Sequence, residues 1–125
     1  MEGERANLKA ISEAIDSPEA FTAKLLQQLV RNGIIHSVKG IQGGFEIPDK
    51  LLSGLRLCDV VKAVDGDGVY TLCAMGLKEC SSRNPCPVHN RFKPIRKELK
   101  SMLESSRIKE MSKGIHSGKT KLRIQ

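Results

Sequence analysis

The chain has 125 residues, enough for one small domain, and 39% of them are hydrophobic. With no Trp, one Tyr and three Phe, its core has to consist mainly of Leu, Ile and Val, which favours small helical units and argues against a large enzyme interior. No segment approaches the roughly 18 apolar residues of a membrane-spanning helix, and the charged residues 1–5 are unlike a signal peptide, so the sequence predicts a cytoplasmic protein.

The net charge of +7 is concentrated in the last third of the chain. Residues 1–86 hold ten basic and eleven acidic side chains, whereas residues 87–125 hold eleven basic and three acidic ones. Such a basic segment suits a polyanionic partner, of which nucleic acid is the commonest. A solvated helix face followed by a flexible tail would have the same composition.

Two short helices are predicted near the start of the chain. Asn7 is a good N-cap for a helix in which Leu8 and Ile11 are among the regularly spaced apolar residues. After a break, Ser17 is a good N-cap and Pro18 a good first residue for a second helix. The second helix carries apolar and polar side chains on opposite faces: Phe21, Leu25, Leu26, Leu29 and Val30 on one, Lys24, Gln27, Gln28 and Arg31 on the other.

A β-hairpin is predicted directly after these helices. Residues 34–39 alternate and are rich in β-branched side chains, the glycine-rich residues 40–44 turn the chain, and residues 45–47 return it. Helix, short break, helix and hairpin is the order of a winged helix-turn-helix. The predicted fold class is therefore mainly α, with a two-stranded wing.

The rest of the chain predicts a short helix, an irregular segment and a long helix. Residues 48–54 have the composition of a loop, residues 57–64 of a short amphipathic helix, and residues 67–86 show no periodicity. Beyond them, apolar residues step by four and three, as in a helix that packs against a partner helix: Val88, Phe92, Ile95, Leu99 and Met102. Pro94 either lies in the first turn of this helix or bends it.

These segments predict a division of the chain into four parts. A winged helix-turn-helix DNA-binding domain is expected over residues 1–66 and a cysteine-rich loop over residues 67–86. A dimerisation helix is expected over residues 87–112, and a flexible basic tail over residues 113–125.

The most specific motif is Cys73-x6-Cys80-x5-Cys86-Pro-Val-His89. Thiolates are the preferred ligands of iron–sulphur clusters, and His can replace Cys at a 2Fe–2S site, so these four side chains are the predicted metal ligands. A structural zinc site, a metal-free thiol–disulfide switch and inert thiols are the alternatives. Cys58, on the apolar face of the short helix, is interpreted as a core residue.

The second helix and the hairpin form the predicted DNA surface. In a helix-turn-helix the second helix enters the major groove, where Gln can read adenine and Lys guanine, and the wing approaches the backbone or the minor groove. The predicted contacts are Ser17, Phe21, Lys24 and Gln28 on the helix and Lys39 and Gln42 on the hairpin. A merely solvated polar face is the alternative.

No Ser/His/Asp arrangement or phosphate-binding loop is found, so the chain is not expected to be an enzyme.

Residues 29–45 have the sequence Leu-Val-Arg-Asn-Gly-Ile-Ile-His-Ser-Val-Lys-Gly-Ile-Gln-Gly-Gly-Phe. This segment resembles the end of the recognition helix and the wing of the Rrf2 family, the IscR/NsrR-type winged-helix regulators. Residues 57–66 resemble the family's next helix, and the three cysteines fall where its cluster-binding members keep theirs. The resemblance implies a homodimer joined by the long helix on a pseudo-palindromic operator. It also implies a cluster on the three cysteines, with His89 in the place of the histidine ligand that favours 2Fe–2S, although 4Fe–4S is possible.

The sequence departs from the family in two places. The gap between Cys73 and Cys80 is longer than usual, and family members begin with another helix after which this chain starts. The apolar faces of residues 8–15 and 25–30 are therefore expected to be less covered, as in a truncated or misassigned start or a member with weakened DNA binding.

The predicted function is that of a repressor-type regulator whose operator affinity responds to redox state, iron–sulphur status or nitric oxide through its cluster. The alternative is a cluster- or zinc-binding redox protein that has lost DNA binding and acts through protein partners.

Overall fold

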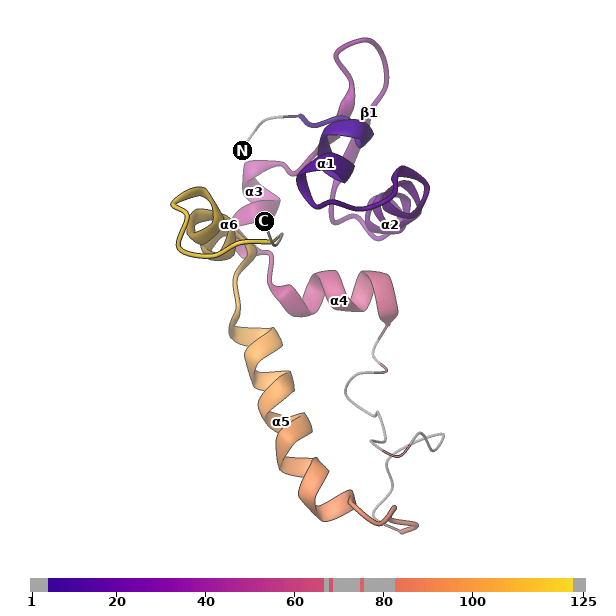
Figure 1. Ribbon diagram of the computed structural model, residues 1–125, viewed down its shortest axis with the longest axis vertical. Coiled ribbons are helices and arrows are strands. Elements are labelled where there is room, and N and C mark those ends of the chain that lie inside the picture. Colours follow the sequence, from indigo (N-terminus) through magenta and orange to yellow (C-terminus); the bar gives the residue numbers. More distant parts are fainter. Residues whose placement is uncertain (1–4, 67, 69–74, 76–82, 123–125) are drawn as a thin grey trace. The chain divides into compact units, whose positions relative to one another are not determined.

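The structure is a computed structural model that describes residues 5–66, 68, 75 and 83–122 (Figure 1). The chain forms two compact units, residues 1–55 with 107–125 and residues 56–106. The first unit contains α1 (Leu8–Ala14), α2 (Glu19–Arg31), β1 (His36–Val38), β2 (Gly44–Glu46), α3 (Asp49–Gly54) and α6 (Ile108–His116). The second contains α4 (Leu57–Asp65) and α5 (His89–Ser105). The predicted mainly helical fold with a two-stranded wing is confirmed.

Helices α1 and α2 form the predicted helix-turn-helix. The side chain of Asn7 accepts a hydrogen bond from the backbone N–H of Ala10 at 2.8 Å, so the expected cap of α1 is confirmed. The chain then turns at Asp16, whose φ is +54°. Pro18 holds the N-cap position of α2 in place of Ser17, whose backbone N–H instead donates to Ser12 at the end of α1.

The wing is an antiparallel hairpin in which Ser37 pairs with Phe45. The segment before α1 pairs with the other side of β2, since Ala6 and Phe45 exchange backbone hydrogen bonds of 3.0 and 2.8 Å. An isolated two-stranded hairpin is only marginally stable, so this third segment braces the root of the wing. Local sequence patterns gave no indication of it.

The core of the first unit is formed by α2, the segment before β1 and the region of α3. Its buried hydrophobic residues are Leu26, Ile35, Leu52 and Leu55. Thr22 is buried as well, and its hydroxyl donates to the carbonyl of Pro18 at 2.9 Å. Burying the hydroxyl therefore leaves no unsatisfied donor.

Helix α3 replaces the loop expected over residues 48–54. Pro48 is its N-cap, Asp49 lies in its first turn, and Leu52 is buried. Proline and an acidic side chain at the beginning of a segment favour a helix start. The helix is only six residues long and ends in Gly54, so it is too short to show a helical pattern and its composition resembles that of a loop.

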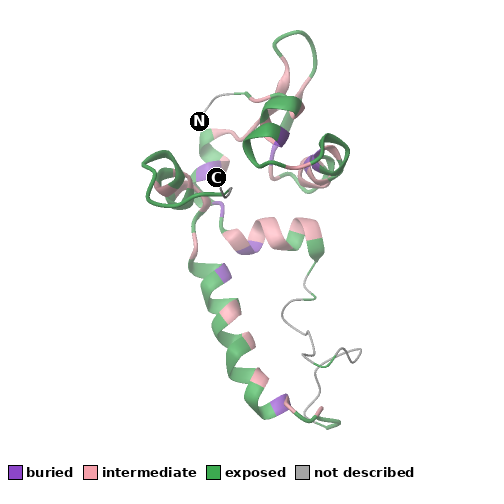
Figure 2. Cartoon of the chain, in the orientation of Figure 1, coloured by how far each residue is buried: buried purple, intermediate pink, exposed green. Residues whose placement is uncertain are grey.

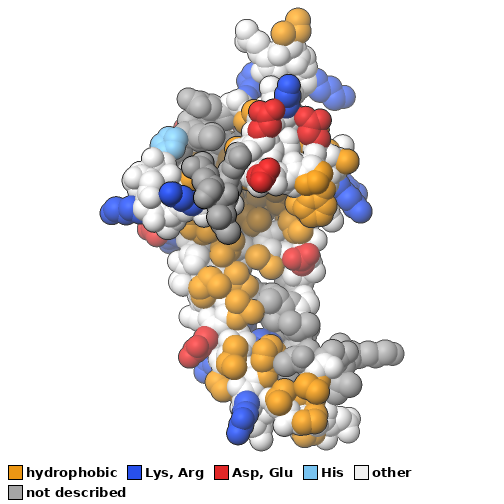
Figure 3. Space-filling model, in the orientation of Figure 1, with side chains coloured by type: hydrophobic (Ala, Val, Ile, Leu, Met, Phe, Trp, Pro, Cys, Tyr) orange, Lys and Arg blue, Asp and Glu red, His pale blue; other side chains and the backbone are white. Residues whose placement is uncertain are grey.

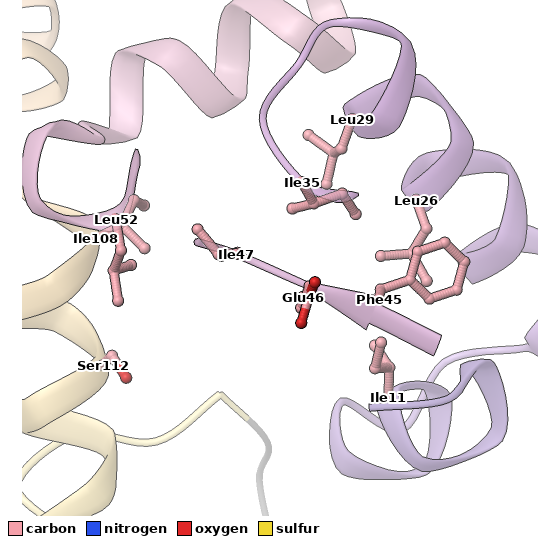
Figure 4. Close-up of a pocket in the computed structure, with 10 residues that line it drawn as sticks. All are labelled: Ile11, Leu26, Leu29, Ile35, Phe45, Glu46, Ile47, Leu52, Ile108 and Ser112. Atoms are coloured by element: carbon pink, nitrogen blue, oxygen red, sulfur yellow. The ribbon is translucent and has the colours of Figure 1, made fainter. Parts of the chain in front are cut away.

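Helix α6 belongs to the first unit and packs beside α3. The backbone N–H of Ile108 donates to the carbonyl of Leu55 at 3.0 Å. A largely apolar pocket of about 310 Å³ is enclosed in part by α6 (Figure 4). Its lining residues are Ile11, Leu26, Leu29, Ile35, Phe45, Glu46, Ile47, Leu52, Ile108 and Ser112.

In the second unit, α4 packs against α5. Helix α4 confirms the short helix predicted over residues 57–64, and its first turn is closed by a 2.9 Å hydrogen bond from the backbone of Arg56 to Asp59. Cys58 and Leu103 are buried, so the interpretation of Cys58 as a core residue is supported. Pro94 lies inside α5, beyond its first turn. The first of the two positions that the sequence allowed for this proline, in the first turn, is therefore not the observed one.

The long helix expected over residues 87–112 is two helices in the structure, and the expected tail from residue 113 begins inside α6. At the end of α5 the carbonyl of Met102 accepts the last helical hydrogen bond, from the backbone N–H of Ser106 at 3.0 Å, and also the Ser106 hydroxyl at 2.7 Å. Serine side chains that bond to backbone carbonyls compete with helix continuation. Along the part of the chain that the structure describes, no helix is long and apolar enough to cross a membrane.

Candidate DNA interface and metal site

Helix α2 presents part of its surface to solvent and buries the rest. Thr22 and Leu26 are buried, whereas Phe21 is 57% exposed and Lys24 is exposed. Phe21 therefore does not share the buried face to which the apolar pattern assigned it, and it is available to a partner, as the predicted DNA surface requires. Gln28 is half-buried; its carbonyl accepts from the backbone and side chain of Asn32, which caps the end of α2.

The remaining predicted contacts also lie in the first unit. Ser17 is half-buried in the turn before α2, and Lys39 and Gln42 are exposed on the hairpin loop. The structure thus brings all six predicted residues into one unit, on α2, the turn before it and the hairpin.

Two arginines near this surface were missed. Arg5 forms a 3.2 Å ion pair with Glu46 on β2 and reaches the carbonyl of Gln42 at 3.4 Å. No local pattern reveals Arg5, because it meets the wing only through a contact between segments far apart in sequence. Arg31, exposed at the end of α2, lines an open hollow of about 270 Å³ together with Ser37 and other residues. Its spacing from Gln28 and Lys24 was the available signal.

The loop end of the hairpin carries one basic residue, Lys39, and Arg5 reaches the same loop through the carbonyl of Gln42. In the space-filling view, Lys and Arg side chains lie on both sides of this end, whereas acidic side chains gather nearer its base (Figure 3). Such a distribution suits a loop that approaches a phosphate backbone.

The predicted metal ligands are only partly covered by the structure. Cys73 and Cys80 lie outside the described residues. Cys86 is half-buried just before α5, and His89 is buried in the first turn of that helix, 7% exposed. The backbone N–H of His89 donates to the carbonyl of Cys86 at 3.0 Å, so one tight turn holds both residues.

Within the described ranges, no three Cys, His, Asp or Glu side chains come together as a metal site. Cys86 and His89 can therefore form a complete site only with ligands from elsewhere, and the motif names Cys73 and Cys80 for that role. Cys58 sits in α4 with its sulphur 3.9 Å from an oxygen of Asp59, as part of the packed unit.

Helix α5 is exposed over most of its length (Figure 2). In the predicted seam, Ile95 is 58% and Met102 46% exposed, while Val88, Phe92 and Leu99 are half-buried. Near the C-terminal end of α5 the buried apolar residue is Leu103, one position after Met102, the last residue of the seam. The helix therefore keeps an apolar stripe that its own unit covers only in part, with Ile95 and Met102 exposed.

Comparison with known proteins identifies the family. Residues 1–114 match the Rrf2 family model, described as an iron-dependent transcriptional regulator. An HTH-type transcriptional regulator named IscR from Yersinia pestis is 28% identical over 83% of this chain, and the chain spans 62% of that protein. Protein aau3 of Rhizobium meliloti is 30% identical, over 79% of this chain and 62% of its own length.

Solved structures share the fold. The global cysteine regulator CymR of B. subtilis has a TM-score of 0.69 at 19% identity, covering 90% of this chain and 81% of that one. IscR of T. potens has a TM-score of 0.68 at 20% identity, covering 94% and 75%. With a recognition helix, a wing and a family match over most of its length, this chain belongs to the Rrf2 family of transcriptional regulators and is a DNA-binding regulator rather than an enzyme.

Proposed function

We propose that an iron–sulphur cluster controls the DNA affinity of this regulator, with Cys73, Cys80, Cys86 and His89 as its ligands and 2Fe–2S favoured over 4Fe–4S. The observation that supports this most directly is the turn at the start of α5. There Cys86 and the buried His89 are held within one turn by a 3.0 Å backbone hydrogen bond.

The donor set fits such a group. Thiolate sulphur binds iron–sulphur clusters, and an imidazole can complete a 2Fe–2S site. When bound, the cluster would supply one-electron redox chemistry and reactivity towards nitric oxide. The part of this chain is to hold ligands at the first turn of α5, so that a change in ligation acts on the position of that helix.

The two regulatory states need to differ by only a few kcal/mol for a ligand to shift their populations. In this proposal two chains pair through α5, and each offers its α2 to one half of a pseudo-palindromic operator in the cytoplasm. Ser17, Phe21, Lys24 and Gln28 contact the major groove, and Lys39 and Gln42 contact the backbone or minor groove.

Anaerobic purification tests the cluster. We expect a coloured protein with iron and labile sulphide, loss of both in Cys86→Ser, and an altered spectrum in His89→Ala. Cys58→Ser is the matched control, because Cys58 is buried in α4 and should leave the iron content unchanged.

A gel shift on the chain's own promoter region, at two salt concentrations, tests the regulatory role. A colourless protein that still binds DNA would overturn the cluster and leave a metal-free regulator. A coloured protein that ignores DNA would instead favour the redox-protein alternative.

A further inference from the structure

One large apolar side chain lies at the end of the wing with nothing packed around it. Ile41 has a relative exposure of 106%, the highest among the exposed large hydrophobic side chains that the structure describes. A single exposed isoleucine is common on protein surfaces, so exposure alone indicates no role. Its setting on the wing of a DNA-binding regulator makes the difference.

The loop geometry fixes where Ile41 lies. The backbone N–H of Gly43 donates to the carbonyl of Gly40 at 3.0 Å, which closes a tight turn with Ile41 and Gln42 at its centre. A Cβ on Gly43 would overlap the carbonyl of Val38, so only glycine permits this turn. The turn therefore places a β-branched side chain, with little freedom about χ1, at its outer end.

The root of the wing is braced against bending. Ala6 pairs with β2 from the side opposite β1, and Arg5 forms its ion pair with Glu46 on the same strand. A loop supported in this way can press an apolar side chain against a partner with less loss of conformational entropy than an unsupported hairpin.

The chemistry around Ile41 matches the DNA minor groove. Lys39 and Gln42 on the same loop are exposed, and Arg5 reaches the carbonyl of Gln42, so the loop combines basic and amide groups with an apolar side chain. Hydrophobic atoms cap the loop end in the space-filling view, with basic side chains beneath them (Figure 3). Lys, Arg and Gln suit the phosphates and floor of the minor groove, and an apolar side chain suits the gap between two base pairs.

We propose that Ile41 is a minor-groove wedge, which enters between two base pairs and partly unstacks them. The wedge selects operators that carry a pyrimidine–purine step, TA or CA, under the wing, because these steps unstack most easily. This inference rests on DNA binding by the winged-helix unit and names a specificity residue within it.

The experiment uses the full-length protein and duplexes that it selects from a randomised pool. Footprinting locates the step under the wing, and 2-aminopurine placed there reports unstacking by a rise in fluorescence. We expect wild-type protein to raise the fluorescence and bend the duplex. Ile41→Ala should lose both effects and bind about 10–100-fold more weakly, as expected from the burial of one aliphatic side chain.

Ile41→Leu should keep both effects, whereas Ile41→Gln, of similar size but polar, should lose them. Leu122→Ala is the matched control, because Leu122 is also exposed, at 65%, but lies in the C-terminal segment. Replacing the TA or CA step with AA should weaken wild-type binding and leave Ile41→Ala unaffected.

Equal affinity, fluorescence and bending for wild type and Ile41→Ala would overturn the wedge while leaving DNA binding intact. Failure of the wild-type protein to select any duplex would overturn DNA binding itself, and the wedge with it.

Discussion

Gly44 lies where the segment before α1 crosses β2. Its φ is +143°, and a Cβ there would lie 2.6 Å from the carbonyl oxygen of Ala6, which is closer than any real contact of that kind. The same glycine-rich loop whose composition predicted a turn thus also permits a third backbone segment to reach the sheet. The strands of the wing are only three residues long, so a single residue can determine whether the hairpin forms.

We therefore expect Gly44→Ala to lower the free energy of unfolding by about 1–3 kcal/mol, through strain at positive φ and displacement of Ala6. Urea denaturation followed by circular dichroism measures this. Gly54→Ala is the control, since a Cβ at Gly54 meets nothing within 4 Å. It should be neutral or stabilising by up to about 1 kcal/mol. Equal losses in the two variants would contradict the close approach of Ala6.

At the same scale, a Lys39 that contacts the backbone, the first of the two places proposed for it, is expected to act through phosphate. Lys39→Gln should weaken binding to all duplexes alike and reduce the slope of log K against log salt by about 1, because one fewer counterion is released. Lys24→Gln should instead relax the preference at one base position. Fluorescence anisotropy on single-base operator variants, between low and moderate salt, separates the two. A change in base preference for Lys39→Gln would contradict its assignment.

At the next scale, that of helices and strands, side-chain hydrogen bonds at the helix ends set the start of α1 and close the end of α2. The cap of α1 at Asn7 follows from a side chain near in sequence, which is why it was predictable, and Asn32 closes α2 by an equally local hydrogen bond. Helix α3 and the break at Ser106 were not predicted. In both places the sequence pattern is compatible with a helix and with a break, and a few local hydrogen bonds decide between them.

Removal of the α1 cap tests this directly. Asn7→Ala should lower the free energy of unfolding by about 1 kcal/mol, because the N–H of Ala10 loses its 2.8 Å partner. Asn7→Ser keeps a cap and should remain within a few tenths of a kcal/mol of wild type. Thermal melts of both variants give the comparison, and identical melts for Ala and Ser would show that the cap contributes nothing.

At the scale of the whole molecule, α5 has an apolar stripe that its own unit covers only in part. Ile95, 58% exposed, lies in this stripe among otherwise charged positions. An apolar stripe at heptad spacing on a charged helix is typical of a helix that pairs with another. Pairing is a property of two chains, so one chain's sequence or structure offers only the surface for it.

Ile95→Glu is expected to raise the Kd of the dimer at least tenfold, because pairing would bury an unpaired carboxylate. Lys97→Glu, an exposed position in the same helix outside the predicted seam, is the control and should leave association nearly unchanged. Sedimentation velocity over a range of concentrations measures both. If wild type sediments as a monomer at every concentration, the seam is not a dimer interface.

The sequence alone determined the helix-turn-helix, the wing and the core position of Cys58, because each rests on short-range patterns: helical spacing, glycine turns and an apolar face. The family resemblance had the same basis. The tertiary structure decided what depends on contacts between distant segments: Arg5 and Ala6 against β2, α6 against α3, and Phe21 in solvent rather than in the core. Such contacts depend on which surfaces meet after folding, and the local periodicity of a segment does not indicate which distant segment it will contact.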